Sequence, residues 1–299
     1  MDFAAMKPAD LRGMIRKGEL TGPTTGMCNG YAQGNLVVLP KALAWDFLLF
    51  CQRNPKACPL LEVADAGERT FAQFGKGSDI ATDIPRYRVY EHGELTGEYT
   101  DVSKFFEERN DLVSFLIGCS FSFESELLEA GIPVRQIEEG VNVPMYNTNI
   151  PCTPAGVFSG NMVVSMRPIP YRQVPAAAAI TAGMPRVHGA PVHLGDPSLI
   201  GIADLQKPDF GDAVAVLADE LPVFWACGAA AALPADRRPA AGVLARSPRP
   251  GAAIRAQARR PVEYRRQPRY GRPCRYPPLS RHPGSRAGRH GRRRRGAAG

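Results

Sequence analysis

Long hydrophobic runs are absent from the 299-residue chain, since no stretch approaches the ~18 apolar residues that a membrane helix needs. The first residues, MDFAAMKPADLRGMIRKGEL, lack the apolar stretch and small-residue cleavage site of a signal peptide. The sequence also contains no G-x-x-x-x-G-K-[ST], G-x-S-x-G or H-E-x-x-H motif and no dinucleotide fingerprint. We therefore expect a cytoplasmic protein with no membrane partner, and we disfavour nucleotide chemistry and serine hydrolysis.

Lysine is absent from residues 229–299, although this segment holds 19 Arg and only two acidic residues, for a net charge of +17. Residues 1–228 carry a net charge of −9, so the +8 of the whole chain conceals an acidic body and a basic tail. Arg, Ala, Pro and Gly make up 52 of the 71 tail residues. Such a segment cannot bury enough apolar surface to offset its chain entropy. We predict an α/β body over 1–228, with a smaller lobe nested near 141–187, and a disordered tail over 229–299.

The composition of the tail has two explanations. Nucleic-acid-binding arms draw on both Lys and Arg, because either side chain neutralises a phosphate. Arg without Lys, together with Ala, Pro and Gly, instead indicates GC-rich codons. Our hypothesis is a frame change just after Cys227-Gly228. The alternative is a selected basic arm that binds nucleic acid through its charge; we expect no specific nucleic-acid partner.

The cysteines and histidines match no strong metal motif. Six cysteines lie in the body, at positions 28, 51, 58, 119, 152 and 227, and their spacing is not that of a zinc ribbon. The stretch RVHGAPVHLGDP brings together two histidines and one aspartate, which could bind a metal, but again without a recognised spacing. We expect thiols, no metal and no cofactor.

Hydrophobic periodicity predicts alternating helices and strands, which indicates an α/β class with mixed α+β elements. Helices are expected over 9–17, 41–54, 102–109, 123–130 and 175–184. A hairpin is expected over 84–99, and strands over 36–40, 133–140, 143–147, 157–169, 213–217 and 221–227. The apolar stretch DLVSFLIG, at 111–118, fits either a strand or the start of a helix.

The stretch LIGCSFSFESELLEAG is the first candidate for chemistry. If its apolar part is a strand, Gly118, Cys119 and Ser120 lie in a turn before a helix, where free N–H groups favour an anion. A thiol at such a position has a lowered pKa. In the alternative interpretation, Ser120 or Ser122 only caps the helix and Cys119 is a core residue.

The histidine loop and one arginine are the next candidates. His188, His193 and Asp196 fall in a Gly/Pro-rich loop, where imidazoles could move protons or merely brace the loop. Arg167, expected near the end of a strand, could hold a substrate carboxylate through two parallel hydrogen bonds. An ordinary surface ion pair explains it equally well.

Two further stretches supply weaker candidates. Asn142, Tyr146 and Asn149 in NVPMYNTN could donate hydrogen bonds to a substrate, although turn chemistry also accounts for the Asn residues. In FWACG, Trp225 is expected in the core, and Cys227 is either a second active-site thiol or a packing residue.

Several stretches together resemble one family. They are GYAQGNLVVLP, FCQRNPKACPLL, TDIPRYRVY, FLIGCSFSFE, NVPMYNTNI, VVSMRP, VHGAPVHLGDP, IGIADLQKPDFGD and PVFWACG. In this order they resemble the bacterial family named "putative hydro-lyase", which is related to the mitochondrial D-glutamate cyclase. The resemblance runs from about Leu11 to Gly228. It implies a two-lobed α/β fold and loss of water from a small acid, with D-glutamate closing to 5-oxo-D-proline as the model reaction.

The resemblance also bears on the tail. Family members continue after W-A-C-G with Thr-Pro and later a Thr-His-x-Pro-Gly segment, whereas this chain departs at Ala229. That departure supports the frame change and would remove closing strands, and with them activity.

The residue roles are inferred from the chemistry, because a lactam-forming dehydration must hold carboxylates and move protons. Arg167 and the Gly118–Ser120 turn would bind carboxylates of a small acidic metabolite, alongside hydrogen bonds from Tyr146 and Asn142. His188 or His193 would move protons, and Glu124 or Asp196 would orient a histidine. Cys119 and Cys227 are site candidates without an assigned step. The alternatives are a non-catalytic small-acid binder and nucleic-acid binding through the tail.

Overall fold

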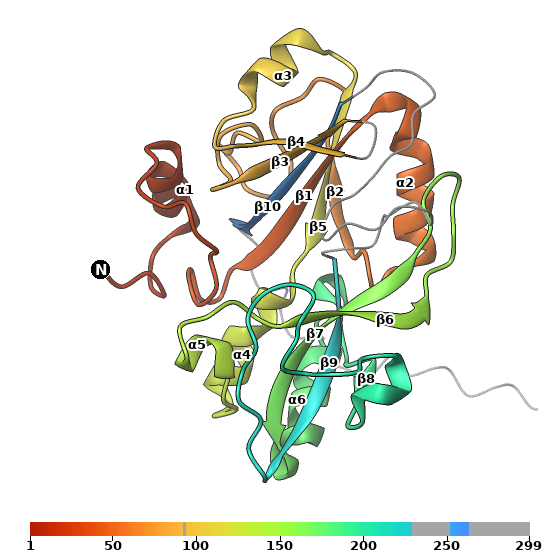
Figure 1. The fold of residues 1–299 in the computed structure, drawn as a ribbon. Helices are drawn as coiled ribbons and strands as arrows, with labels where there is room; N and C mark the ends of the chain where they lie inside the picture. Colours follow the sequence, from red (N-terminus) through yellow and green to blue (C-terminus); the bar gives the residue numbers. More distant parts are fainter. Residues whose placement is uncertain (92–93, 229–251, 263–299) are drawn as a thin grey trace, which may run out of the picture. The chain divides into compact units, whose positions relative to one another are not determined.

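The computed structural model describes residues 1–91, 94–228 and 252–262, the last of these as backbone only (Figure 1). These described residues all belong to one compact unit. Its strands form two antiparallel sheets with helices packed against them. The predicted α/β class with mixed α+β elements is confirmed. Within the described part of the chain, no helix combines the length and apolar character that crossing a bilayer requires.

Sheet A has six strands in the order β2-β5-β1-β10-β3-β4. Their bounds are Leu60–Val63, Leu112–Gly118, Ala32–Pro40, Ala252–Val262, Tyr87–Glu91 and Glu94–Tyr99. Side chains alternate across the central strand β1, so that Leu36 and Val38 enter one core cluster and Val37 and Leu39 enter another. The second cluster includes Phe47 on helix α2 (Lys41–Arg53). Both faces of β1 are therefore buried over residues 36–39, in agreement with the continuous apolar run there.

Strand β10 comes from the segment that was predicted to be disordered. Ala252–Val262 pairs with β1 on one side and with β3 on the other, antiparallel to both. The expected lack of regular structure therefore does not extend to these eleven residues, because two neighbouring strands supply backbone partners on both sides. The rest of the predicted tail, residues 229–251 and 263–299, lies outside the described residues.

Sheet B has four strands in the order β6-β7-β9-β8. Their bounds are Met145–Pro151, Asn161–Pro170, Glu220–Cys227 and His193–Leu194. Cross-strand partners share a face, so the pairing of Arg167 with Val223 and of Ser165 with Trp225 places these four side chains on one face. Helix α6 (Val174–Ala182) packs with Val223 and Trp225 in one core cluster.

Most predicted elements are confirmed. Helices α1 (Pro8–Arg16), α2, α3 (Ser103–Glu108), α4 (Glu124–Glu129) and α6 lie where apolar periodicity and flanking Gly or Pro indicated them. The ambiguous stretch at 111–118 is strand β5, buried over its whole length. Two strand predictions are wrong: PVRQIEEG contains helix α5 (Arg135–Glu138), and AVAVL at 213–217 forms no strand.

A short segment links the two sheets. Strand β5 of sheet A ends at Gly118, a one-turn helix follows over Ser120–Phe123, and α4 begins at Glu124 (Figure 1). A side chain at position 118 would collide with the backbone, since an added Cβ would lie 2.0 Å from the carbonyl oxygen of Arg186. Glycine at this position thus permits close packing against the loop that precedes His188.

We predict that Gly118→Ala destabilises the protein by ~1–3 kcal/mol, because the Arg186 carbonyl belongs to the backbone and cannot rotate away. Gly13→Ala is the matched control. Gly13 lies inside α1 with nothing within 4 Å of an added Cβ, so alanine should stabilise by ~0.5–1 kcal/mol. Urea unfolding of both variants measures the difference, and equal effects of the two substitutions would contradict the close approach.

Candidate active site

The segment after β5 places a buried ion pair against sheet B. Arg167, on β7, is fully buried, and its Nη2 pairs with Oε1 of Glu124 at the start of α4. The same guanidinium donates to Oγ of Ser120 at 3.2 Å and to Oγ of Ser165 at 3.1 Å. Arg167 is therefore neither a surface ion pair nor a group facing open solvent; it holds Glu124.

Two aromatic rings enclose the guanidinium of Arg167. Its central carbon lies 4.9 Å from the ring centroid of Phe123 and 5.5 Å from that of Trp225. Trp225 is itself fixed, since its indole N–H donates to Thr181 Oγ1 at 3.1 Å. These rings exclude water from the ion pair, which strengthens the attraction between the two charges and raises the cost of separating them.

Glu124 is only 2 % exposed, and both of its carboxylate oxygens accept hydrogen bonds. Gln136 Nε2 donates to the same oxygen as Arg167, Oε1, at 2.8 Å. Thr25 Oγ1 donates to the other oxygen, Oε2, at 3.2 Å. The two oxygens are thus unlike: Oε1 is held by a cation and an amide inside the core, while Oε2 meets the loop before β1.

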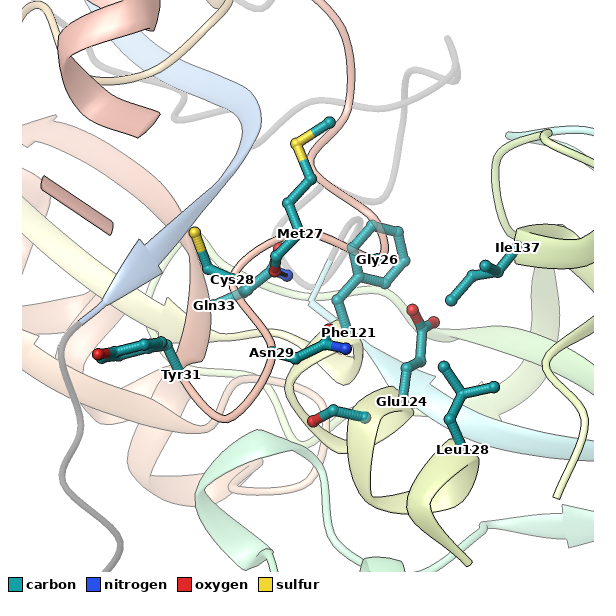
Figure 2. A pocket seen from close by; sticks show the side chains of 11 residues that line it. Gly26, Met27, Cys28, Asn29, Tyr31, Gln33, Phe121, Glu124, Leu128 and Ile137 are labelled. Carbon is teal, nitrogen blue, oxygen red and sulfur yellow. Dashed lines mark hydrogen bonds between the residues drawn. The ribbon is translucent and has the colours of Figure 1, made fainter. Parts of the chain in front are cut away.

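Glu124 lines a small pocket (Figure 2). Its walls come from the loop before β1, from β1, from the turn and helix after β5, and from α5. The lining residues are Gly26, Met27, Cys28, Asn29, Tyr31, Gln33, Phe121, Glu124, Ser125, Leu128 and Ile137. Glu124 is the only charged side chain among them. Burial raises the pKa of the Cys28 thiol to about 11, so this sulfur is protonated at neutral pH and is a poor nucleophile.

Gln33 fixes the loop that forms one wall of this pocket. Its Nε2 donates to the carbonyl oxygens of Thr24 at 3.1 Å and Met27 at 3.2 Å, and its Oε1 accepts from Thr24 Oγ1 at 2.8 Å. Its backbone N–H donates to Ser122 Oγ at 2.8 Å, and that hydroxyl donates to the Gln33 carbonyl oxygen at 3.2 Å. Ser122 therefore ties β1 to the turn that carries Glu124.

Comparison with known proteins gives one consistent result. The D-glutamate cyclase family model matches residues 113–251. A Clostridium beijerinckii protein named "Putative hydro-lyase" is 64% identical over 228 residues, which cover 76% of this chain and 86% of that protein. "Putative hydro-lyase YcsI" of Bacillus subtilis is 58% identical over 223 residues, which cover 75% of this chain and 86% of that protein.

The chain belongs to the D-glutamate cyclase family. The predicted enzyme class, a lyase, is confirmed with it. The match to the D-glutamate cyclase model runs to residue 251, beyond the Ala229 boundary of the frame-change hypothesis, which stays a prediction.

Three predicted site residues of this D-glutamate cyclase family member, His188, Cys119 and Cys227, are buried. His188 is 1 % exposed, and its Nδ1 donates to the carbonyl oxygen of Lys56 at 2.7 Å. Cys119 and Cys227 lie in one apolar cluster, where Cys227 Sγ contacts Met145 Sδ at 3.5 Å. Cys119 directly precedes the segment that carries Glu124, Cys227 packs against it, and His188 follows a turn that contacts it. None of the three side chains lines the pocket.

Two other predicted residues, His193 and Tyr146, lie on the opposite face of sheet B from Arg167. His193 pairs with Phe224 across strands β8 and β9, whereas Arg167 pairs with Val223. Consecutive residues of a strand face opposite sides, so the sheet separates His193 from the ion pair. Tyr146 faces the same side as Phe224, and its hydroxyl donates to the Leu205 carbonyl oxygen at 2.7 Å.

Asp196 and Asn142 have local structural partners. His193 Nε2 donates to the backbone carbonyl of Asp196 at 2.7 Å, and the orientation of a histidine by Glu124 or Asp196 stays a prediction. The Asp196 carboxylate instead accepts from the Ser198 N–H at 2.9 Å, and hydrogen bonding by Ser198 lowers the pKa of Asp196. The backbone N–H of Asn142 donates to Asp212 Oδ2 at 2.9 Å.

We expect strong energetic coupling between Glu124 and Arg167. Arg167→Met should cost ~3–5 kcal/mol, because it leaves a carboxylate buried without its cation. The double variant Arg167→Met/Glu124→Gln should lose less than the sum of the single losses. The exposed pair of Arg88 and Glu98, at 2.7 Å, is the matched control, with an expected coupling of ~0.2–1 kcal/mol. Denaturant unfolding of the single and double variants of each pair measures the two coupling energies. Similar coupling energies for the two pairs would contradict a buried pair.

Gln33→Met should loosen the pocket wall while preserving side-chain volume. We expect a loss of ~1–3 kcal/mol, since the Thr24 hydroxyl and two carbonyls lose their partner, together with faster amide exchange over residues 24–28. Gln173→Met removes only a hydrogen bond to the Gly131 carbonyl at an exposed position and should change stability by less than ~0.5 kcal/mol. Unchanged exchange over 24–28 in Gln33→Met would show that Gln33 does not hold the loop.

Proposed function

We propose that the pocket beside Glu124 removes water from a small amino acid, with closure of D-glutamate to 5-oxo-D-proline as the model reaction. The observation that carries the proposal is the asymmetry of Glu124. Its Oε1 is held by Arg167 and Gln136, while its Oε2 accepts, among the described residues, only from Thr25, in the loop before β1 that forms one wall of the pocket. A carboxylate in that position suits the ammonium group of an amino acid.

The reaction needs two protons to leave nitrogen and one oxygen to leave carbon. The substrate ammonium loses two protons, the nitrogen attacks the side-chain carboxylate carbon, and one oxygen of that carboxylate departs with both protons as water. Glu124 Oε2 would accept a proton from the ammonium and return it to the departing oxygen. A positioned carboxylate that transfers protons in this way contributes ~10²–10⁴ in rate.

Neutral side chains would receive the substrate carboxylates. Asn29, Tyr31 and Ser125 line the pocket with groups that can donate hydrogen bonds without competing for the ammonium. Arg167 would act through Glu124 as a positioning residue and Ser120 would act through Arg167, in place of the carboxylate-binding role expected from the sequence. His188, Cys119 and Cys227 remain candidates for the same site, supported by their closeness in sequence or packing to the Glu124 segment.

A cytoplasmic location also remains a proposal. It is supported by the six cysteines of the described residues, none of which forms a disulfide. The non-catalytic binder is the competing function for the same pocket, and binding of nucleic acid through the basic tail is a separate alternative that predicts steep weakening by salt.

Conversion of D-glutamate to 5-oxoproline, followed by mass spectrometry, tests the proposal. Glu124→Gln should reduce turnover by ~10²-fold or more, because the amide cannot accept the proton. Glu129→Gln, at the exposed end of the same helix, should leave turnover unchanged. Thermal stabilisation by D-glutamate without any product would support the non-catalytic binder instead, and full turnover in Glu124→Gln would overturn the role of this residue.

A further inference from the structure

Asn29 differs from the other polar residues of the Glu124 pocket because its side-chain amide is both exposed and directed inward. It lines the pocket together with Glu124, and Figure 2 shows its amide pointing toward the side on which Glu124 lies, whereas the hydroxyl of Tyr31 points away. The Asn29 side chain makes no hydrogen bond to any residue that the structure describes. Its N–H groups can therefore donate to a ligand without first breaking a bond within the protein.

The backbone on both sides of Asn29 is in the left-handed region. Cys28 has a φ of 52° and Gly30 has a φ of 82°. Glycine adopts such angles without strain, whereas the Cβ of any other residue makes them unfavourable. Strained backbone persists only where neighbouring groups hold it, and it is concentrated at functional sites. The conformation at Cys28, which directs Asn29 into the pocket, must therefore be held by contacts with the rest of the protein.

Those contacts come from residues 2–6, which we call the strap. The Cys28 N–H donates to the carbonyl oxygen of Phe3 at 2.9 Å. The Asn29 N–H donates to the carbonyl oxygen of Ala4 at 2.7 Å. Two successive backbone hydrogen bonds thus hold the strained residue and the pocket residue that follows it.

The strap is folded and anchored by its own side chains. Asp2 Oδ1 accepts from the N–H groups of Ala4 at 3.0 Å and Ala5 at 3.3 Å. The ring of Phe3 packs against the apolar cluster that the loop forms with α1. The loop before β1 is therefore held in two places, by Gln33 in its first half and by the strap in its second.

We propose that Asn29 binds the α-carboxylate of the amino-acid substrate and that the strap positions Asn29 for this contact. The proposal rests on the function proposed above for the Glu124 pocket. In that reaction the side-chain carboxylate loses an oxygen, while the α-carboxylate keeps its charge from substrate to product. A group that stays charged is costly to bury, so it suits the exposed part of the pocket at Asn29, and the reacting groups suit the buried part at Glu124.

Asn29→Asp tests the contact, because it keeps the size of the side chain and replaces a donor by a negative charge. It should raise the KM for D-glutamate ~10-fold or more, as expected for the loss of a hydrogen bond to a charged group. The kcat should change little, since the contact is the same in substrate and transition state. Asn161→Asp, at an exposed position on β7 outside the pocket, is the matched control and should leave both constants unchanged.

Asp2→Ala and Asp2→Asn test the strap. Alanine removes the acceptor that folds the strap, whereas asparagine retains an oxygen at the same place. Asp2→Ala should therefore speed hydrogen exchange of the Cys28 and Asn29 amides ~5-fold, the effect of one lost hydrogen bond, and should raise KM. Asp2→Asn should restore the wild-type values. Exchange followed by NMR measures these two amides without any substrate.

These measurements separate the present proposal from the function on which it rests. Wild-type turnover combined with an unchanged KM in Asn29→Asp would overturn the role of Asn29 and leave the proposed function standing. If the wild-type protein binds 5-oxo-D-proline in calorimetry without turnover, loss of that binding in Asn29→Asp supports the contact and retained binding overturns it. A wild-type protein that neither converts D-glutamate nor binds the product contradicts both proposals. Unchanged exchange in Asp2→Ala would show that the strap does not position Asn29.

Discussion

The buried pair of Glu124 and Arg167 is the interaction on which the candidate site depends. Two charges removed from water are tolerated only when their geometry is good and their remaining hydrogen-bonding groups are largely satisfied. Gln136, Ser120 and Ser165 supply those hydrogen bonds, and aromatic rings seal the guanidinium. Strand β7, the turn after β5 and helix α5 must therefore hold fixed positions relative to one another. The pocket wall that contains Glu124 is therefore also held in a fixed position.

The arrangement also explains why the site lies where the two sheets are joined. Strand β5 delivers the Gly118–Glu124 segment from sheet A onto a face of sheet B, and β1 supplies Gln33 to hold the loop on the far side of the pocket. The hydroxyl of Ser122 and the backbone N–H of Cys119 both bond to Gln33 and so connect these two contributions. The charged group and the loop that covers it are thus positioned by different strands of one sheet.

Strong periodicity made most of the fold predictable from the sequence, and weak signals account for the errors. Helix α2 has one wide apolar face, and β3 and β4 are two strand-like runs on either side of His92-Gly93, so both were found. Helix α5 has only four residues, too few for a helical period to differ from a strand. The run at 213–217 is apolar enough for a strand, yet sheet B pairs β9 with β8 and β7 instead.

The candidate site was predictable in its charged residues but not in its geometry. Glu124 and Arg167 are charged residues, which can be recognised as site candidates from the sequence alone, and both were predicted as site residues. Gln33 and Gln136 carry no such signature, because a glutamine in a strand or short helix is ordinary until its partners are known. His193 was placed with Arg167 because both are functional residue types; only the register of β8 against β9 shows that the sheet separates them.

A crystal structure of the protein with 5-oxo-D-proline tests the central claim most directly. If the pocket beside the ion pair is the reaction site, the lactam N–H will lie within hydrogen-bond distance of Glu124 Oε2, with Arg167 still bound to Oε1. Product bound instead beside His193, on the opposite face of sheet B, would contradict the assignment.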